Sequence, residues 1–140
     1  MGPVIQMEVR IAKSPERVWA GLTTGVGSWW RGQKGEDLGM VLEPRPGGRL
    51  YRDLGQDTGH FWGVVQVIKP PSLLEITGPL FFSAAVLSHL SFRIREEGGG
   101  SVVRLTQSVN GEVGEDFITH AEGGWRQVME KGLKAYVEQH

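Results

Sequence analysis

The sequence predicts an α+β domain in which a curved antiparallel sheet wraps a long C-terminal helix. Three observations support this. Residues 4–11 alternate between apolar and polar side chains, which is typical of a half-buried strand. Residues 38–109 divide into short apolar segments joined by brief turns. Residues 115–137 place apolar side chains at three- and four-residue steps, as an amphipathic helix does.

The first strand is followed by one or two short helices. Ser14-Pro15-Glu16 is a strong helix start, with serine as the N-cap, proline in the first turn and an acidic residue next to it. This helix runs through Leu22 and ends at Gly25 and Gly27. Ser28-Trp29-Trp30 then predicts a second short helical turn.

Six further segments have the composition of strands. Their connectors are too short for crossovers, so we expect antiparallel neighbours in a sheet of six or seven strands. The first and last strands should be adjacent, because one continuous sheet must cover the final helix. The predicted strands are Leu38–Glu43, Arg49–Leu54, His60–Ile68, Leu73–Gly78, Val86–Arg95 and Val102–Val109.

The C-terminal helical pattern contains glycines that are unusual inside a helix. Gly123 and Gly124 stand directly before Trp125, and each costs about 1 kcal/mol relative to alanine. We interpret this pair as a kink or as a close approach to the sheet. Trp125 lies on the apolar stripe and should be largely buried.

Length and composition narrow the class of protein. A chain of 140 residues and 15.4 kDa fits one domain spanning residues 1–140. The formal net charge of -1, without a basic run, argues against a nucleic-acid partner. No stretch is long and apolar enough for a membrane span, and the N-terminus has no signal-peptide pattern, so we expect a cytoplasmic protein.

The sequence contains no recognisable motif for binding a metal or a nucleotide. There is no cysteine, and the four histidines have no paired ligand spacing, so we expect no metal site. Phosphate-loop, dinucleotide and serine-elbow motifs are also missing, so we expect no cofactor.

Several local patterns together resemble a known superfamily. They are Ser14 to Trp19, Trp29-Trp30, Gly47 to Tyr51, Gly59 to Val65, Pro70 to Leu74 and Gly123-Gly124-Trp125. In this order they resemble the START/SRPBCC (birch-pollen-allergen-like) superfamily. The branch they resemble most is that of the C-terminal domain of the activator of the ninety-kilodalton heat-shock ATPase. The resemblance implies the helix-grip fold, often with a cavity between sheet and helix, but the superfamily includes carriers, cyclases, receptors and co-chaperones.

The aromatic and apolar side chains suggest a binding pocket under the sheet. Alternation places Phe61, Val65, Leu90 and Phe92 on the concave face, with Trp125 and Met129 opposite on the helix. Trp30 and Phe82 complete the candidate ligand-binding set. The alternative is that these side chains simply fill the core. Phe81-Phe82 follows a turn, so this apolar loop is either a lid or partner contact, or a cap on the end of the barrel.

Three polar residues are candidate ligand contacts: Arg52, His60 and Gln107. Alternation places Arg52 on the same strand face as Leu50, and Gln107 on the same face as Leu105. If these faces point inward, each polar side chain would require a buried partner or a ligand. Alternatively, Arg52 extends its long stem to water from the strand end.

Three functions remain open. The first is non-catalytic binding of a small hydrophobic molecule between sheet and helix. The second, implied by the resemblance, is a protein-interaction domain that acts on a heat-shock ATPase. The third is a cyclase- or hydrolase-like enzyme, for which His60 and Arg52 are the only candidate groups. No pair of carboxylates is placed for acid–base catalysis, and the sequence predicts no oligomeric state.

Overall fold

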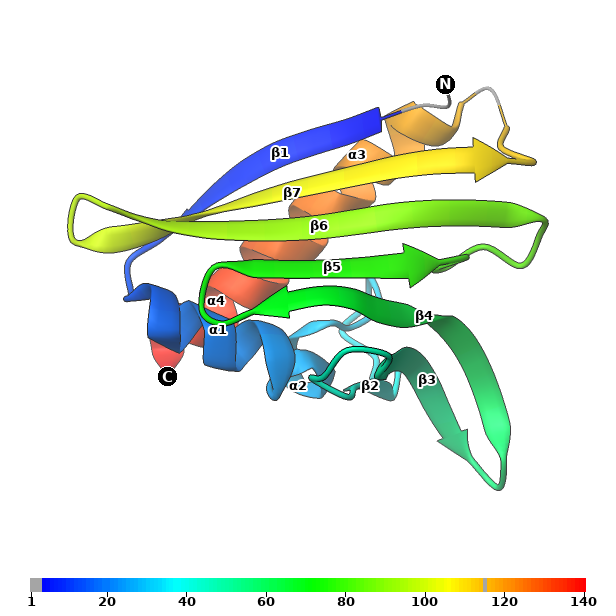
Figure 1. Cartoon of the computed structure of the whole chain (residues 1–140), viewed down its shortest axis with the longest axis horizontal. Coiled ribbons are helices and arrows are strands. Elements are labelled where there is room, and N and C mark those ends of the chain that lie inside the picture. Colours follow the sequence, from blue (N-terminus) through cyan, green and yellow to red (C-terminus); the bar gives the residue numbers. More distant parts are fainter. Residues whose placement is uncertain (1–3, 115) are drawn as a thin grey trace.

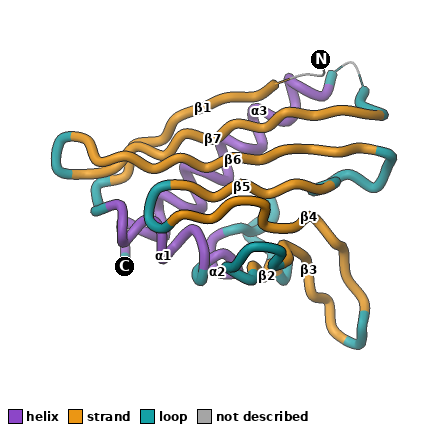
Figure 2. Tube along the Cα trace, in the orientation of Figure 1, coloured by secondary structure: helices purple, strands orange, loops and turns teal. Residues whose placement is uncertain are grey.

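A seven-stranded antiparallel sheet is laid across a long C-terminal helix in the computed structural model, which describes residues 4–114 and 116–140 (Figures 1 and 2). The helical elements are α1 (Pro15–Thr23), α2 (Val26–Trp29), α3 (Phe117–Gln127), the π-helical segment η1 (Val128–Lys134) and α4 (Ala135–Gln139). The strands are β1 (Val4–Ile11), β2 (Met40–Leu42), β3 (Arg49–Gly55), β4 (Thr58–Lys69), β5 (Leu73–Gly78), β6 (Val86–Glu97) and β7 (Gly100–Gly111).

The sheet has the order β1-β7-β6-β5-β4-β3-β2, and every neighbouring pair is antiparallel. The first strand therefore pairs with the last, as expected, with Val4 opposite Ser108 and Ile11 opposite Ser101. The α+β helix-grip architecture is confirmed. The β3–β4 hairpin projects beyond the rest of the sheet (Figure 1).

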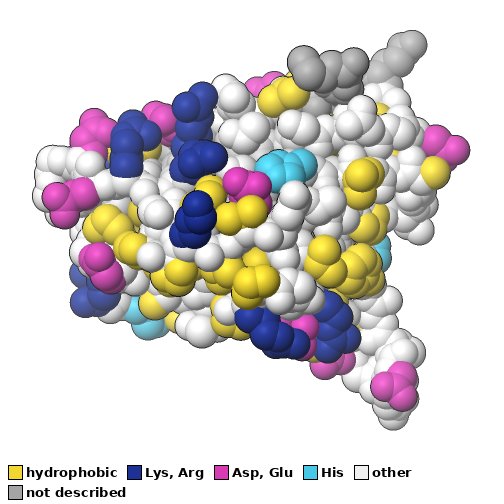
Figure 3. Space-filling view, in the orientation of Figure 1, with side chains coloured by type: hydrophobic (Ala, Val, Ile, Leu, Met, Phe, Trp, Pro, Cys, Tyr) yellow, Lys and Arg dark blue, Asp and Glu magenta, His cyan; other side chains and the backbone are white. Residues whose placement is uncertain are grey.

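The two faces of the sheet differ as the alternation requires. In β1 the side chains of Ile5, Met7, Val9 and Ile11 are buried, whereas the residues between them are exposed. The outward face mixes charges of both signs (Figure 3). Arg95, for example, pairs with Glu8 at 3.1 Å and with Glu97 at 3.2 Å.

Helix α1 starts where the sequence predicts. The Ser14 hydroxyl accepts a hydrogen bond from the backbone N–H of Arg17 at 3.3 Å, and Pro15 opens the helix. The Trp29 indole N–H, from α2, donates to the carbonyl of Gly21 at 2.7 Å. This bond fixes α2 and the connection that follows it against α1.

The C-terminal helix begins at Phe117, and Glu115, the predicted start, lies outside the described residues. Its close approach to a neighbour occurs at Gly132, where a Cβ would lie 2.6 Å from the Trp29 carbonyl oxygen. The prediction of a close approach at Gly123 and Gly124 is wrong, because a Cβ at either position would meet nothing within 4 Å.

Strand β4 departs from simple alternation at Trp62. Leu50 pairs with Gly63 and Tyr51 with Phe61, so Trp62 is an extra residue, a β-bulge, in this strand. The bulge turns Trp62 and Val65 inward and leaves Phe61 47% exposed on the opposite face. The predicted inward orientation of Phe61 is therefore wrong.

One continuous hydrophobic core lies between the sheet and the helices. Leu90 and Phe92 from β6, Val65 from β4, and Met129 and Leu133 from η1 are almost completely buried in it. The space beneath the central strands is thus occupied by side chains.

Candidate functional site

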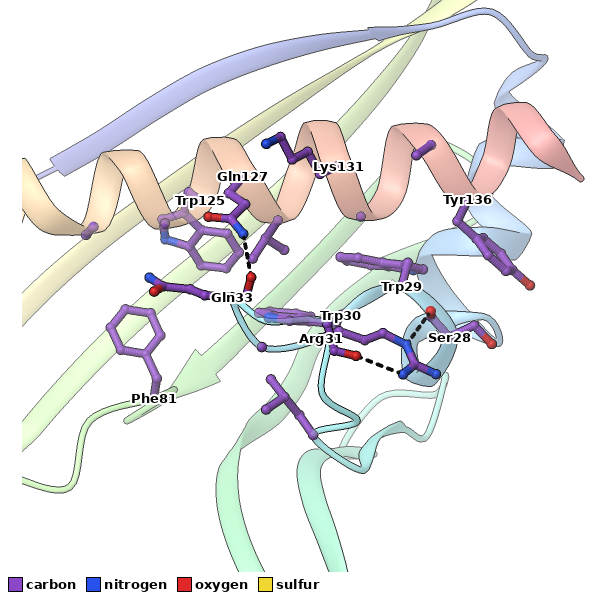
Figure 4. A pocket seen from close by; sticks show the side chains of 18 of the residues that line it. Ser28, Trp29, Trp30, Arg31, Gln33, Phe81, Trp125, Gln127, Lys131 and Tyr136 are labelled. Atoms are coloured by element: carbon purple, nitrogen blue, oxygen red, sulfur yellow. Dashed lines mark hydrogen bonds between the residues drawn. The ribbon is translucent and has the colours of Figure 1, made fainter.

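An open groove of about 760 Å³ lies on one side of the molecule. It runs between the C-terminal helix and the connection that leads from α2 to β2, with Phe81 at one end (Figure 4). One wall is formed by Ser28–Gln33, Gly35 and Leu38, and the other by one side of α3, η1 and α4. No residue of the β-strands lines it. The groove therefore lies beside the core, on the flank of the long helix.

Three closely packed tryptophan side chains, those of Trp29, Trp30 and Trp125, lie at the floor of the groove. Trp29 and Trp30 are stacked with centroids 5.4 Å apart, and the ring of Trp30 lies 5.3 Å from that of Trp125. Trp30 also stands edge-on to the core residue Trp62 at 5.3 Å. Such offset and edge contacts are the arrangements that aromatic rings prefer. The rings are consequently held by one another before any ligand arrives.

A phenylalanine cluster closes one end of the groove. Phe81 packs on Trp125 at 6.3 Å and on Phe117 at 6.5 Å, and Phe82 packs on Phe117 at 5.2 Å. The preceding residue, Leu80, is fully buried and anchors this loop in the core. The Phe81-Phe82 loop therefore caps the end of the barrel and also forms part of the groove.

Gln107 has a buried protein partner. Its Oε1 accepts a hydrogen bond from the Trp125 indole N–H at 2.7 Å, and its Nε2 donates to the Ser88 hydroxyl at 3.2 Å. All three side chains are buried. This chain of bonds joins α3 to the sheet and fixes the orientation of the Trp125 ring at the groove.

A hydrogen bond also joins helix α3 to the α2–β2 connection across the groove. Gln127 Nε2 donates to the backbone carbonyl of Gln33 at 3.3 Å (Figure 4). Gly124 lines the groove one turn before Gln127, and the space above it is open. A glycine here keeps the groove wide, because any larger side chain would enter it.

The ionisable groups that are perturbed most lie away from the groove. A side-chain hydrogen bond from Arg49 holds the pKa of Glu43 at about 2, and the Lys134 ammonium lowers the pKa of Glu138. Neither carboxylate lines the groove. Among the described residues there is also no cluster of three metal-ligating side chains.

Residues 12–138 match the family model described as Activator of Hsp90 ATPase homolog 1-like protein. The chain belongs to this family. The resemblance to the START/SRPBCC superfamily is thereby confirmed, and the family is abbreviated AHSA1 below. No curated protein matches the chain.

Solved structures have the same fold as this AHSA1-like chain. A protein from Mesorhizobium loti is 22% identical, with a TM-score of 0.75 and 98% of each chain covered. One from Rhizobium leguminosarum is 17% identical, with a TM-score of 0.76 over 100% of this chain and 97% of the other. The Aha1 dimer from Colwellia psychrerythraea is 20% identical, with a TM-score of 0.72 over 97% and 96% of the two chains.

The AHSA1-like structure brings only part of the predicted apolar set to the groove. Trp30 and Trp125 line it, and Phe82 belongs to the ring cluster at its end. The others lie outside it: Val65, Leu90, Phe92 and Met129 are in the core, and Phe61 is on the outer face.

The predicted polar contacts do not line the groove either. Arg52 donates from Nε to the Leu38 carbonyl at 2.8 Å, and the His60 ring lies 3.3 Å from the Phe82 carbonyl. Both side chains thus hold loops next to the groove. The sequence reasoning missed residues 31–38 and the helix residues Gly124, Val128 and Lys131. Besides the two tryptophans, the glycine pair was the signal in the sequence that pointed to this region, and Gly124 lines the groove.

No helix in the described residues is long and apolar enough to cross a membrane.

Proposed function

We propose that this AHSA1-like protein binds a small, largely apolar molecule in the groove between the C-terminal helix and residues 28–38. The observation that carries the proposal is the groove itself. Its volume of about 760 Å³ falls within the range of about 300–1,000 Å³ found for small-molecule sites. Its floor includes the rings of Trp29, Trp30 and Trp125, which already pack on one another.

The position of the groove differs from the one that the sequence predicts. The space beneath the central strands is filled by Leu90, Phe92 and Met129, so it offers no room for a ligand without repacking. The groove needs no such rearrangement. A flat apolar molecule would rest on Trp30 and Trp125, with Phe81 at its end.

Two neighbouring glycines provide a matched test. Gly124 lines the groove, whereas Gly123 is exposed and does not. Leucine at either position keeps the helix and improves its intrinsic propensity. Gly124→Leu places a side chain in the groove, and Gly123→Leu places the same side chain in solvent.

The probe is 2-naphthamide, a neutral bicyclic compound, and binding is measured by isothermal titration calorimetry. Wild type and Gly123→Leu should bind it with similar affinity and gain melting temperature as its concentration rises. Gly124→Leu should lose binding while remaining folded. Equal binding by both variants, or no binding by wild type, would overturn the proposal.

The family match supports a second candidate, a protein-interaction domain that acts on a heat-shock ATPase. Exposed apolar side chains at Leu54, Phe61 and Leu87 offer contacts on the outer face of the sheet. This candidate predicts that the protein changes the ATP turnover of a purified Hsp90. It also predicts that Phe61→Ser weakens the effect while Gly124→Leu does not.

An enzymatic role has weaker support. The two candidate groups, His60 and Arg52, do not line the groove. In the part of the chain that the structure describes, no carboxylate is found among the residues that do.

A further inference from the structure

The groove has an uneven charge although the chain as a whole is slightly acidic. The formal net charge is -1, yet among the described residues the fully charged side chains that line the groove, Arg31 and Lys131, are cations. Arg31 stands on the connection and Lys131 on the helix (Figure 4). Within residues 4–114 and 116–140, no aspartate or glutamate is among the lining residues.

The Lys131 ammonium has neither a hydrogen bond nor an ion pair within the described parts of the chain. Other cations of the same helix are paired: Arg126 lies 3.5 Å from Glu130, and Lys134 lies 2.8 Å from Glu138. Arg31 donates to the carbonyls of Ser28 at 3.1 Å and Gly35 at 3.2 Å, which are neutral acceptors. The positive charge of Lys131 is therefore available to a ligand.

Three of the acidic residues that flank the groove's walls in sequence make contacts within their own segments. The carboxylate of Glu36 accepts the backbone N–H of Lys34 at 2.9 Å, and that of Asp37 accepts the N–H of Gly39 at 2.8 Å. Asp116 lies 3.4 Å from the ring of His120. Backbone N–H groups are neutral, so Glu36 and Asp37 keep their negative charge close to Arg31, whose backbone pairs with that of Asp37. The cation left to a ligand is therefore Lys131, on the opposite wall.

We infer that the ligand of this groove is an amphipathic anion, with a flat apolar body on the tryptophan rings and an acidic group paired with Lys131. The inference rests on the proposed function and names its ligand class. Cations that border a low-dielectric surface raise the local concentration of anions. An acidic group at Lys131 would form an ion pair while the ring system remained on Trp30 and Trp125.

The experiment compares 2-naphthoate with 2-naphthamide, which share a ring system and differ in charge. Calorimetric titrations are run with wild type, Lys131→Gln and the control Arg126→Gln, which removes a cation of the same helix outside the groove. Because Lys131 is exposed, its substitution should leave the melting temperature unchanged.

In wild type the naphthoate should bind about three- to tenfold more tightly than the amide, as expected for a solvent-exposed ion pair. The preference should fall toward unity in Lys131→Gln and at high salt, and should persist in Arg126→Gln. Equal affinities for the two probes in wild type, or an unchanged preference in Lys131→Gln, would overturn the assignment of an anionic ligand. If wild type bound neither probe, the groove itself would be refuted as a binding site.

Discussion

The bond between Trp125 and Gln107 should make a measurable contribution to stability, since it joins the C-terminal helix to the sheet. Trp125 is 4% exposed and Gln107 is fully buried, and their N···O distance is 2.7 Å. Trp125→Phe keeps an aromatic ring but removes the donor. The Gln107 carbonyl oxygen would then be buried without a partner, which costs about 1–3 kcal/mol.

The smaller ring also leaves unfilled volume, so the total loss for Trp125→Phe should be about 2–4 kcal/mol. Trp125→Ala should cost about 3–5 kcal/mol, because most of the buried surface disappears. Gln107→Leu should be destabilising too, since it leaves the indole N–H of Trp125 and the hydroxyl of Ser88 without their partner.

A double-mutant cycle isolates the bond itself. In Trp125→Phe/Gln107→Leu both ends of the bond are removed together, so the double variant should cost less than the sum of the single variants by about 1–3 kcal/mol. Equilibrium unfolding in urea, followed by far-UV circular dichroism, measures each free energy without relying on tryptophan emission. Additivity within about 0.5 kcal/mol would show that the two side chains are not coupled and would refute the reasoning.

Other predictions concern two glycines and a carboxylate. Gly123→Ala should raise the free energy of unfolding by about 0.5–1 kcal/mol, because the site is open and alanine favours a helix. Gly132→Ala should lower it by about 1–3 kcal/mol, because the new Cβ would meet the Trp29 carbonyl oxygen at 2.6 Å; a stabilising effect in the same urea assay would contradict this. The pKa of Glu43 is lowered from 4.5 to about 2, so its carboxylate stabilises the fold above pH 4.5 and loses this effect as the pH falls toward 2. Glu43→Gln should therefore flatten the decline in stability across that interval, and an unchanged acid titration of stability would refute the role of this ion pair.

Regular periodicity was the part of the sequence that predicted the fold well. The alternation in residues 4–11 and 86–95 gave the correct faces, because each of these strands pairs without a register shift. The helix start at Ser14 was correct for a similar reason, since capping is a local interaction.

The predicted side-chain orientation was wrong where pairing with a distant strand interrupts the regular alternation. The bulge at Trp62 arises from the pairing of β3 with β4, and no residue type in β4 announces it. Strict alternation from Val65 back to Phe61 therefore placed Phe61 on the wrong face of the sheet. The close approach of the helix was assigned to Gly123 and Gly124 instead of Gly132, because spacing cannot say which neighbour a glycine meets.

The candidate site was predictable only in its tryptophans. Large aromatic side chains such as Trp30 and Trp125 suggest either a core or a pocket, and here they serve both. The wall formed by residues 31–38 has no periodic pattern, so only the folded chain reveals that it faces the helix. The role proposed for Lys131 likewise depends on which acidic groups are already paired, and this is a property of the tertiary structure.

The most direct test of the central claim is a ¹⁵N–¹H NMR titration of the tryptophan indole groups with 2-naphthoate. Trp29, Trp30 and Trp125 line the groove, whereas Trp19 does not and serves as an internal control. Binding in the groove predicts that the signals of Trp30 and Trp125 shift with ligand concentration while the signal of Trp19 stays in place. Shifts confined to the methyl groups of the core residues Leu90 and Val65, with the indole signals of Trp30 and Trp125 unmoved, would place the ligand beneath the sheet and contradict the account.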